Sequence, residues 1–316
     1  MKIVIPGGTG QVGVILARAF HRDGHELTVL SRSSQSVPWQ VVNWDGKTIG
    51  DWVAAIDGAD LVVNLAGYTV NCRYNETNRQ RIMNSRIDST RVIGQAIRQS
   101  ARPPATWMQA STATIYAHSF DVPNDETNGI IGGREENVPD TWKFSIDVAT
   151  AWERAVDEFE LPKTRQLKLR SAIILSPDRG GIFDELLRLV RFGLGGTAGR
   201  GDQFVSWVHY KDFVRAVYWL VEHEEISDVV NIASPNPLPN QAFMKALREA
   251  WGIPFGLSAP EWMLEVGALL MRTETELILK SRRVVPGLLL ENGFSFQHPS
   301  WPQAAESLCA EWRAVE

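Results

Sequence analysis

The chain has 316 residues, of which 44% are hydrophobic, and its formal net charge at pH 7 is −5. A chain of this size can bury a large core and exceeds the usual size of one small domain. The negative charge argues against nucleic acid or an anionic membrane as the main partner. No apolar stretch approaches the roughly 20 residues that a membrane-spanning helix needs. Its two cysteines, Cys72 and Cys309, suggest no disulfide framework, so we expect a cytoplasmic protein.

A glycine-rich turn follows the first apolar segment. Ile3, Val4 and Ile5 predict a buried strand, and a helical pattern begins directly after the turn. Glycines let a backbone approach a ligand closely, and a helix N-terminus attracts a pyrophosphate. The alternative is an ordinary strand-to-helix turn. We expect a bound dinucleotide, contacted by Gly7, Thr9, Gly10, Gln11, Val12 and Gly13.

The second predicted strand, at residues 27–30, indicates which dinucleotide. It ends in Ser31, Arg32 and Ser33, where an enzyme that uses the unphosphorylated cofactor would carry an acid for the ribose hydroxyls. Arg32 can instead pair with a 2'-phosphate, and the serine hydroxyls can add donors. We therefore predict NADP. The alternative is that Arg32 is a solvated loop residue.

Two further predicted strands approach the same cofactor. The strand at residues 40–45 ends in Asp45, which either reaches the adenine amino group or forms a turn before Gly46. The strand at residues 60–67 ends in Leu65, Ala66 and Gly67, whose small size lets the backbone lie close to the ribose and phosphates.

Strand and helix signals alternate through the first half of the chain. Helical patterns span about 78–100 and 145–159, and a sixth strand spans 167–176. This alternation predicts an α/β fold with a Rossmann-like, doubly wound parallel sheet. Beyond Pro177 the character changes, so we divide the chain into an NADP-binding domain at 1–176 and a smaller C-terminal α/β substrate lobe at 177–316. Strands around 203–232 are expected to interleave between the two.

A hydroxyl-rich segment follows the fifth predicted strand, at the sheet edge where open parallel sheets usually carry their chemistry. Ala110, at the end of that strand, is expected to lie against the cofactor. Ser111, Thr112 and Tyr116 are the catalytic candidates. The alternatives are a hydroxyl that satisfies the strand end for Thr112 and simple packing for Tyr116. His118 is a further candidate general acid.

These segments carry a family resemblance. The glycine turn, residues 64–67, 111–116 and 206–212 resemble an extended short-chain dehydrogenase/reductase of the sugar-nucleotide epimerase/dehydratase kind. Residues 85–87, 193–196 and 283–286 resemble, more narrowly, the atypical "epimerase family protein" group with a C-terminal extension of unknown function. The resemblance covers nearly the whole chain and implies an NADP-binding fold with a cleft between two lobes.

The chain departs from the wider family at its proton-transfer pair. That family uses a Tyr and a Lys one helical turn apart, so that the ammonium lowers the phenol's pKa. Alignment with the family puts Phe144 or Ser145 at the tyrosine position and Val148 or Ala149 at the lysine position. The ordinary acid–base pair is therefore missing.

The resemblance also implies where a substrate would be held. Extended members recognise a polar substrate group from the second lobe, where we assign Arg200, Trp207 and His209. Arg73, after the fourth strand, could anchor an anionic substrate. Alternatively, Trp207 and His209 only fix their strand against the lobe. We expect Asp212 to cap a helix that begins at Phe213.

Two interpretations of the whole chain follow. The first is an NADP(H)-binding oxidoreductase in which Thr112 orients a carbonyl or alcohol and a water, Tyr116 or a substrate group completes proton transfer. The second is an NADP(H)-binding sensor or interaction module without chemistry. An enzyme should keep a polar pocket lined by Arg73, Trp207 and His209. The enzyme interpretation would lose support if Arg200 and Trp207 packed away from the nicotinamide.

We expect no metal site, a small-molecule partner, and a homodimer through the two long helices. A sugar-nucleotide epimerase that works by the ordinary mechanism is a third, weaker interpretation.

Overall fold

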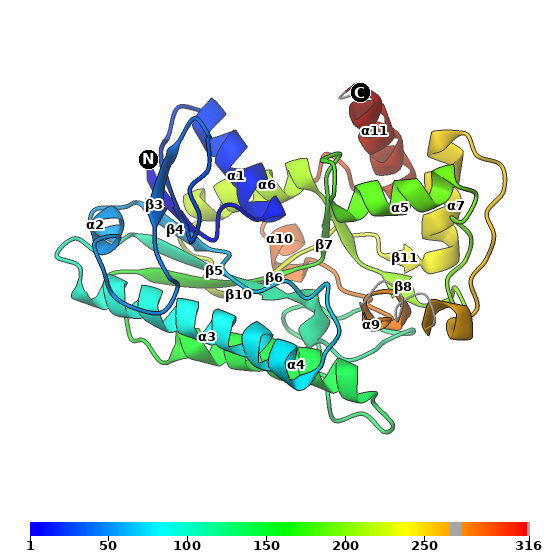
Figure 1. Cartoon of the computed structure of the whole chain (residues 1–316), viewed down its shortest axis with the longest axis horizontal. Helices are drawn as coiled ribbons and strands as arrows, with labels where there is room; N and C mark the ends of the chain where they lie inside the picture. Colours follow the sequence, from blue (N-terminus) through cyan, green and yellow to red (C-terminus); the bar gives the residue numbers. More distant parts are fainter. Residues whose placement is uncertain (266–273, 315–316) are drawn as a thin grey trace.

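A computed structural model describes residues 1–265 and 274–314 of the chain. Its centre is a seven-stranded sheet in the order β10-β6-β5-β4-β1-β2-β3, with every neighbouring pair parallel (Figure 1). The strands are β1 (Lys2–Pro6), β2 (Glu26–Ser31), β3 (Gln40–Asn43), β4 (Leu61–Asn64), β5 (Thr106–Thr112), β6 (Arg165–Ser171) and β10 (Asp228–Ile232). The order reverses between β1 and β4, so the ends of these two strands form the crevice where doubly wound sheets bind ligands. The Rossmann-like fold class is confirmed.

Helices cover both faces of the sheet. In Figure 1, α1 (Gln11–Arg22) and α6 (Tyr210–Glu222) lie above it, and α3 (Glu76–Gln99) and α4 (Asp140–Asp157) lie below it. The short helices α2 (Val53–Ile56), η1 (Ala113–Ile115) and α10 (Gly287–Glu291) complete this part of the fold.

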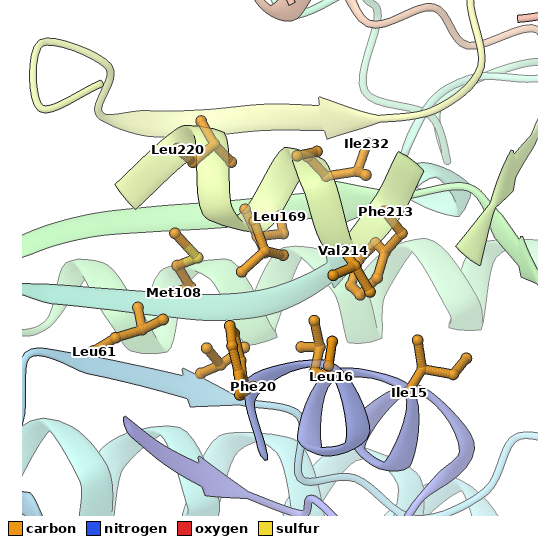
Figure 2. Close-up of a cluster of buried hydrophobic side chains, with 14 of the residues drawn as sticks. Ile15, Leu16, Phe20, Leu61, Met108, Leu169, Phe213, Val214, Leu220 and Ile232 are labelled. Atoms are coloured by element: carbon orange, nitrogen blue, oxygen red, sulfur yellow. The ribbon is translucent and has the colours of Figure 1, made fainter. Parts of the chain in front are cut away.

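The strands bury both of their faces, as parallel strands do. In β1, Ile3 and Ile5 join the core with α1 and α6, while Val4 joins the core with α2 and α3. Figure 2 shows the first of these cores, where Leu16 and Phe20 of α1 meet side chains from α6 and the sheet. The glycine turn and the neighbouring strand ends are therefore held on a rigid base.

A second core lies beside the sheet. Three helices build it: α5 (Ile182–Arg191), α7 (Asn240–Trp251) and α11 (Trp301–Ala314). Two small sheets accompany them. In one, β7 (Ile173–Leu175) pairs with β9 (Trp207–His209), and in the other, β8 (Phe204–Val205) pairs with β11 (Leu238–Pro239). A further short helix is α9 (Glu276–Leu279). The seventh strand of the main sheet, β10, comes from beyond residue 177, so the chain crosses between the two regions.

Several predicted boundaries are corrected. The sixth strand is two strands, because β6 stays in the main sheet while β7 pairs with β9. The helix expected from Ser145 begins at Asp140. Helix α6 begins at Tyr210, and its N-cap is His209, whose Nδ1 accepts from the Lys211 backbone N–H at 3.2 Å. Asp212 is not the cap: its carboxylate accepts from the backbone N–H groups of residues 297 and 298.

Candidate functional site

Two cavities meet at the carboxyl ends of the central strands. The glycine-turn cavity, about 330 Å³, is lined by Gly7, Gly10, Arg32 and Ala66 among others. The strand-end cavity, about 300 Å³, is lined by residues from the ends of β5, β6 and β7 and from α3, α4 and α9. Leu65, directly after β4, lines both. The two cavities are therefore adjacent.

The glycine turn depends on contacts that only glycine allows. Gly7 has φ +76°, and a Cβ there would lie 2.6 Å from Cα of Ala66. A Cβ on Gly13 would lie 2.4 Å from Cα of Gly8. Gly10 is the N-cap of α1 and has no side chain to satisfy the amide groups of the first turn. These groups remain available for an anion.

The other end of the glycine-turn cavity is cationic. Arg32 is exposed at its edge, and Lys47 lines it as well while pairing with Asp88 at 3.7 Å. The Ser31 hydroxyl accepts from the Ser33 backbone N–H at 3.2 Å, and both serines line the cavity. Sequence reasoning found Arg32 and the serines but missed Lys47, which follows a different strand. The two cations together suit a phosphate.

Asp45 takes the turn-forming alternative. Its carboxylate accepts from the backbone N–H groups of Lys47 and Thr48, both at 2.8 Å, and from the Thr48 hydroxyl at 2.6 Å. These hydrogen bonds, that of the Thr48 hydroxyl first, lower the pKa of Asp45 to about 2. Asp45 still lines the glycine-turn cavity, but its oxygens are engaged within the loop.

The predicted hydroxyls line the strand-end cavity together with Val12 and Ala110. The Thr112 oxygen accepts from the Thr114 backbone N–H at 3.1 Å, so its hydrogen can be directed to another acceptor. The Ser111 hydroxyl donates to Glu153 at 2.5 Å and is committed to that bond. Of these two hydroxyls, that of Thr112 keeps a hydrogen that a ligand could accept. Gln11 and Gly13 lie outside both linings; Gln11 donates to the Ser176 hydroxyl at 3.2 Å.

Tyr116 requires a correction. It is 2% exposed and does not line the strand-end cavity. Its hydroxyl donates to Asn231 at 2.9 Å and receives a hydrogen bond from Arg170 at 3.0 Å. Burial, which outweighs the nearby Arg170, raises the pKa of Tyr116. The phenol belongs to a buried network with Arg170 and Glu153 and does not reach a substrate.

The substrate-lobe assignments also change. Trp207 and His209 are fully buried. Trp207 packs edge-on against Trp301 in the second core, and His209 stacks on His298 with ring centroids 3.7 Å apart. Both therefore fix their strand, and neither lines the strand-end cavity.

Three other polar side chains that the sequence analysis proposed, those of Arg200, Arg73 and His118, form contacts with neighbouring protein groups. Arg200 is exposed and pairs with Asp202 at 2.5 Å, and Arg73 pairs with Glu274 at 3.3 Å. His118 accepts from the Ser281 backbone N–H at 2.8 Å. Burial, followed by nearby Lys280, lowers the pKa of His118.

Other polar side chains do line the strand-end cavity. They are Arg86 of α3, Tyr74 of the loop before α3, Ser145 of α4 and Glu276 of α9. Phe144 and Val148, which one of the two possible alignments places at the family's tyrosine and lysine positions, line it too. The Arg86 guanidinium donates to the carbonyl oxygens of Tyr68 and Ile82, and burial lowers its pKa to about 10. Sequence reasoning quoted Arg86 only as part of a resemblance and did not single out Glu276.

Within residues 1–265 and 274–314, no group of three or more His, Cys, Asp or Glu side chains could hold a metal ion. The same part of the chain contains no helix long and apolar enough to cross a membrane.

Two family models match the chain in series. Residues 3–134 match the NAD dependent epimerase/dehydratase family, and residues 259–308 match Domain of unknown function (DUF1731). The sequence is 28% identical over 315 residues to human epimerase family protein SDR39U1, covering 98% of this chain and 100% of that protein. It is also 28% identical over 324 residues to epimerase family protein YfhF of Bacillus subtilis (strain 168), covering 100% of both.

A solved structure shares the same fold. The crystal structure of human SDR39U1 (isoform 2) with NADPH superposes with a TM-score of 0.85 at 27% identity, covering 98% of this chain and 99% of that one. The resemblance to the epimerase family proteins that the sequence motifs indicated is confirmed by these matches.

Proposed function

Because this chain carries an NAD dependent epimerase/dehydratase module and resembles epimerase family proteins along its whole length, we propose that it is an NADP(H)-dependent oxidoreductase. One observation carries the proposal: the glycine-turn cavity, with cations and no acid at the end of β2, lies beside a strand-end cavity lined by the Thr112 hydroxyl, and the two share Leu65. A dinucleotide that fills the first cavity would present its nicotinamide to the second.

The preference for NADP(H) rests on charge. Arg32 and Lys47 line the same end of the glycine-turn cavity, and the 2'-phosphate that distinguishes NADP from NAD carries the complementary charge. Gly7, Gly10 and the first turn of α1 would hold the pyrophosphate. When bound, the nicotinamide supplies or accepts a hydride.

The strand-end cavity suits a small carbonyl or alcohol. Thr112 would donate its hydroxyl hydrogen to the reacting oxygen. Apolar side chains such as Val12, Ile174 and Phe213 form much of the lining and would exclude water. Arg86 adds a partly buried cation, so a substrate with one acidic group is favoured over a neutral one.

A non-catalytic NADP(H) sensor is the second candidate. It is favoured by the missing Tyr/Lys pair and by the way Arg200 and Trp207 pack away from the strand-end cavity. The enzyme proposal loses the support that those two residues would have supplied, and rests on Thr112, Arg86 and the other polar groups of that cavity. Pairing of two copies through α3 and α4, and a cytoplasmic location, stay predictions.

The first test is a fluorescence titration with NADPH and NADH in parallel. We expect wild type to bind NADPH at least tenfold more tightly than NADH, and Arg32→Ala to remove most of that preference, because one charge-assisted contact to the 2'-phosphate is lost. The matched control is Arg22→Ala. Arg22 is an exposed arginine at the end of α1 that pairs with Asp23, and its variant should bind both dinucleotides as wild type does.

The second test is turnover. NADPH-loaded protein is offered a panel of small aldehydes and ketones with and without a carboxylate, and NADPH oxidation is followed. Oxidation by wild type that Thr112→Ala reduces supports the enzyme. If no compound reacts, and Thr112→Ala alters no binding, the sensor becomes the better interpretation. Equal binding of both dinucleotides would contradict the cofactor assignment.

A further inference from the structure

The C-terminal module of unknown function contributes a carboxyl group to the strand-end cavity. Glu276 is the first residue of α9, within the segment 259–308 that matches DUF1731. It is 1% exposed and lines the same cavity as Thr112 and Ser145. A carboxyl this deeply buried is costly unless it is paired or has a use.

The two oxygens of Glu276 have different surroundings. Oε2 receives a hydrogen bond from the Ser145 hydroxyl. Oε1 lies 3.6 Å from Nη2 of Arg282, and within the described parts of the chain it has no hydrogen-bond partner. Because Arg282 pairs with this oxygen without a hydrogen bond, the oxygen can still accept a hydrogen bond from a ligand. The cavity is the place from which a ligand could supply it.

Ser145 links this carboxyl to the missing acid–base pair. By alignment it occupies one of the two positions open to the family's catalytic tyrosine, and Phe144, at the other, cannot titrate. The hydroxyl of Ser145 points at Glu276, so the carboxyl is held against the position where the phenol would otherwise stand. Burial raises the pKa of Glu276 above its usual range, against the opposing effects of Arg282 and Ser145. A raised pKa makes the carboxyl easier to protonate, as a group that transfers a proton requires.

We propose that Glu276 is the catalytic acid and base of this site, with Ser145 as its positioning residue; the inference rests on the proposed oxidoreductase function. In the reduction, the substrate carbonyl carbon gains a hydride from the nicotinamide. The carbonyl π bond breaks, and its oxygen takes the proton from the Glu276 carboxyl. The products are the alcohol, the oxidised nicotinamide and the Glu276 carboxylate. The C-terminal module thereby replaces the lost Tyr/Lys pair.

Two other groups are less suited to this role. Tyr74 lines the cavity, but it lies before α3 and not at the family's tyrosine position, and burial raises the pKa of its phenol, opposite to the lowering by which the family's lysine activates its tyrosine. Lys280 does not line the cavity, and its ammonium donates to the Thr114 carbonyl oxygen at 2.7 Å.

The test is Glu276→Gln, which keeps the shape of the side chain and an acceptor for Ser145. We expect the NADPH Kd to stay within twofold of wild type, and kcat for a compound that wild type reduces to fall by about 100-fold or more. Glu306→Gln, an exposed glutamate of the same module, is the matched control and should leave both unchanged. Ser145→Ala should lower kcat less than Glu276→Gln does, since the acid remains but is no longer oriented.

A second readout needs no substrate. In infrared spectra of the NADPH-loaded protein recorded along an acid titration, one carboxyl should become protonated at a higher pH than an exposed glutamate, and its band should disappear in Glu276→Gln and persist in Glu306→Gln. Absence of that difference overturns the inference even if wild type turns over. So does a folded Glu276→Gln that retains kcat, or a Tyr74→Phe variant that loses turnover while Glu276→Gln keeps it. If wild type reduces nothing in the panel, the proposed function fails first and separately.

Discussion

Whether a polar side chain can act on a ligand is decided by which of its atoms are already engaged. Ser111 and Thr112 are neighbours in the same strand and line the same cavity. Ser111 gives its only hydroxyl hydrogen to Glu153, whereas Thr112 accepts from the backbone and keeps its hydrogen. The same reasoning removes Tyr116, whose hydroxyl is bonded on both sides. Residue type alone could not separate these three candidates.

Burial, rather than contact geometry, determines how much the Arg170–Glu153 ion pair contributes to the free energy of unfolding. Arg170 makes two bonds to Glu153, at 2.8 and 2.7 Å, and Arg91 makes two bonds to Glu158, at 2.7 and 2.6 Å. The side chains of the first pair are 11% and 9% exposed, and those of the second are 50% and 43% exposed. The chain therefore holds a matched pair of arginines that differ in their surroundings.

We predict that Arg170→Met lowers the free energy of unfolding by about 3–5 kcal/mol, because it leaves the Glu153 carboxylate buried without its cation. Arg91→Met should cost about 0–1 kcal/mol, since water replaces the lost contact. Urea-induced unfolding of the two variants measures both values. Equal losses would show that the buried network adds nothing beyond a surface pair.

Sequence reasoning found the residues whose role is local in the chain. Gly7, Gly10 and Arg32 follow their strands directly, so motif spacing identifies them. Glu276 meets Ser145 across 131 positions, and nothing near either residue indicates that contact. Trp207 and His209 belong to a quoted motif, but the motif does not say which way their side chains face. Both side chains point into the protein interior. Their burial depends on α11 and other elements that are distant in the sequence.

At the scale of elements, helix existence was predictable and helix starts were not. Asp212 was expected to cap a helix that begins at Phe213. The structure instead uses His209, because Asp212 is drawn to the backbone of residues 297 and 298. The strand around 167–176 divides for a similar reason: β7 pairs with β9, which arrives from the second region. In both cases a distant segment overrides the local pattern.

The cap of α6 also makes a pH-sensitive element. Burial, followed by the neighbouring His298, lowers the pKa of His209 from 6.5 to about 3. Lys211 acts in the same direction, and Glu311 opposes it. The unfolded chain therefore takes up a proton near pH 6.5 that the folded chain does not. Stability from this group is complete above that pH and is lost as the pH falls toward 3, by about 1.4 kcal/mol per pH unit.

We predict that His209→Asn reduces this loss by about 2 kcal/mol between pH 6.5 and 5, because asparagine can still cap the helix but does not titrate. Urea unfolding at pH 7, 6 and 5 gives the slopes. The exposed His21→Asn is the control and should keep the wild-type slope. A His209→Asn slope as steep as that of wild type would assign the acid sensitivity to other groups.

At the scale of the whole molecule, the C-terminal module is joined to the sheet through buried polar contacts. The Glu126 carboxylate accepts from the backbone N–H groups of Asn231 in β10 and Leu288 in α10. The Ser206 hydroxyl donates to the carbonyl oxygen of Arg282 at 2.6 Å and accepts from the Val284 backbone N–H at 2.8 Å. A parallel sheet covered on both faces was predictable from the alternation of strands and helices. The attachment of residues 274–314 was not, because short irregular segments carry no periodicity.

Two tryptophans of this module test whether it folds together with the rest of the chain. Trp301 is 1% exposed, stacks on Phe243 with ring centroids 4.0 Å apart and donates to the Phe243 carbonyl oxygen at 2.8 Å. Trp262 is 66% exposed. Both lie within residues 259–308, so the same substitution probes the inside and the outside of one module.

We predict that Trp301→Ala lowers the free energy of unfolding by about 3–5 kcal/mol, through the lost burial and the cavity that remains. Trp262→Ala should change it by less than about 0.5 kcal/mol. Circular dichroism and tryptophan fluorescence should follow one shared guanidinium transition in Trp301→Ala, because α11 completes a core that also contains β7 and β9. Two separate transitions would mean that the module unfolds on its own. A carboxyl supplied by such a module could not be held at the strand-end cavity as firmly as a proton-transfer group requires.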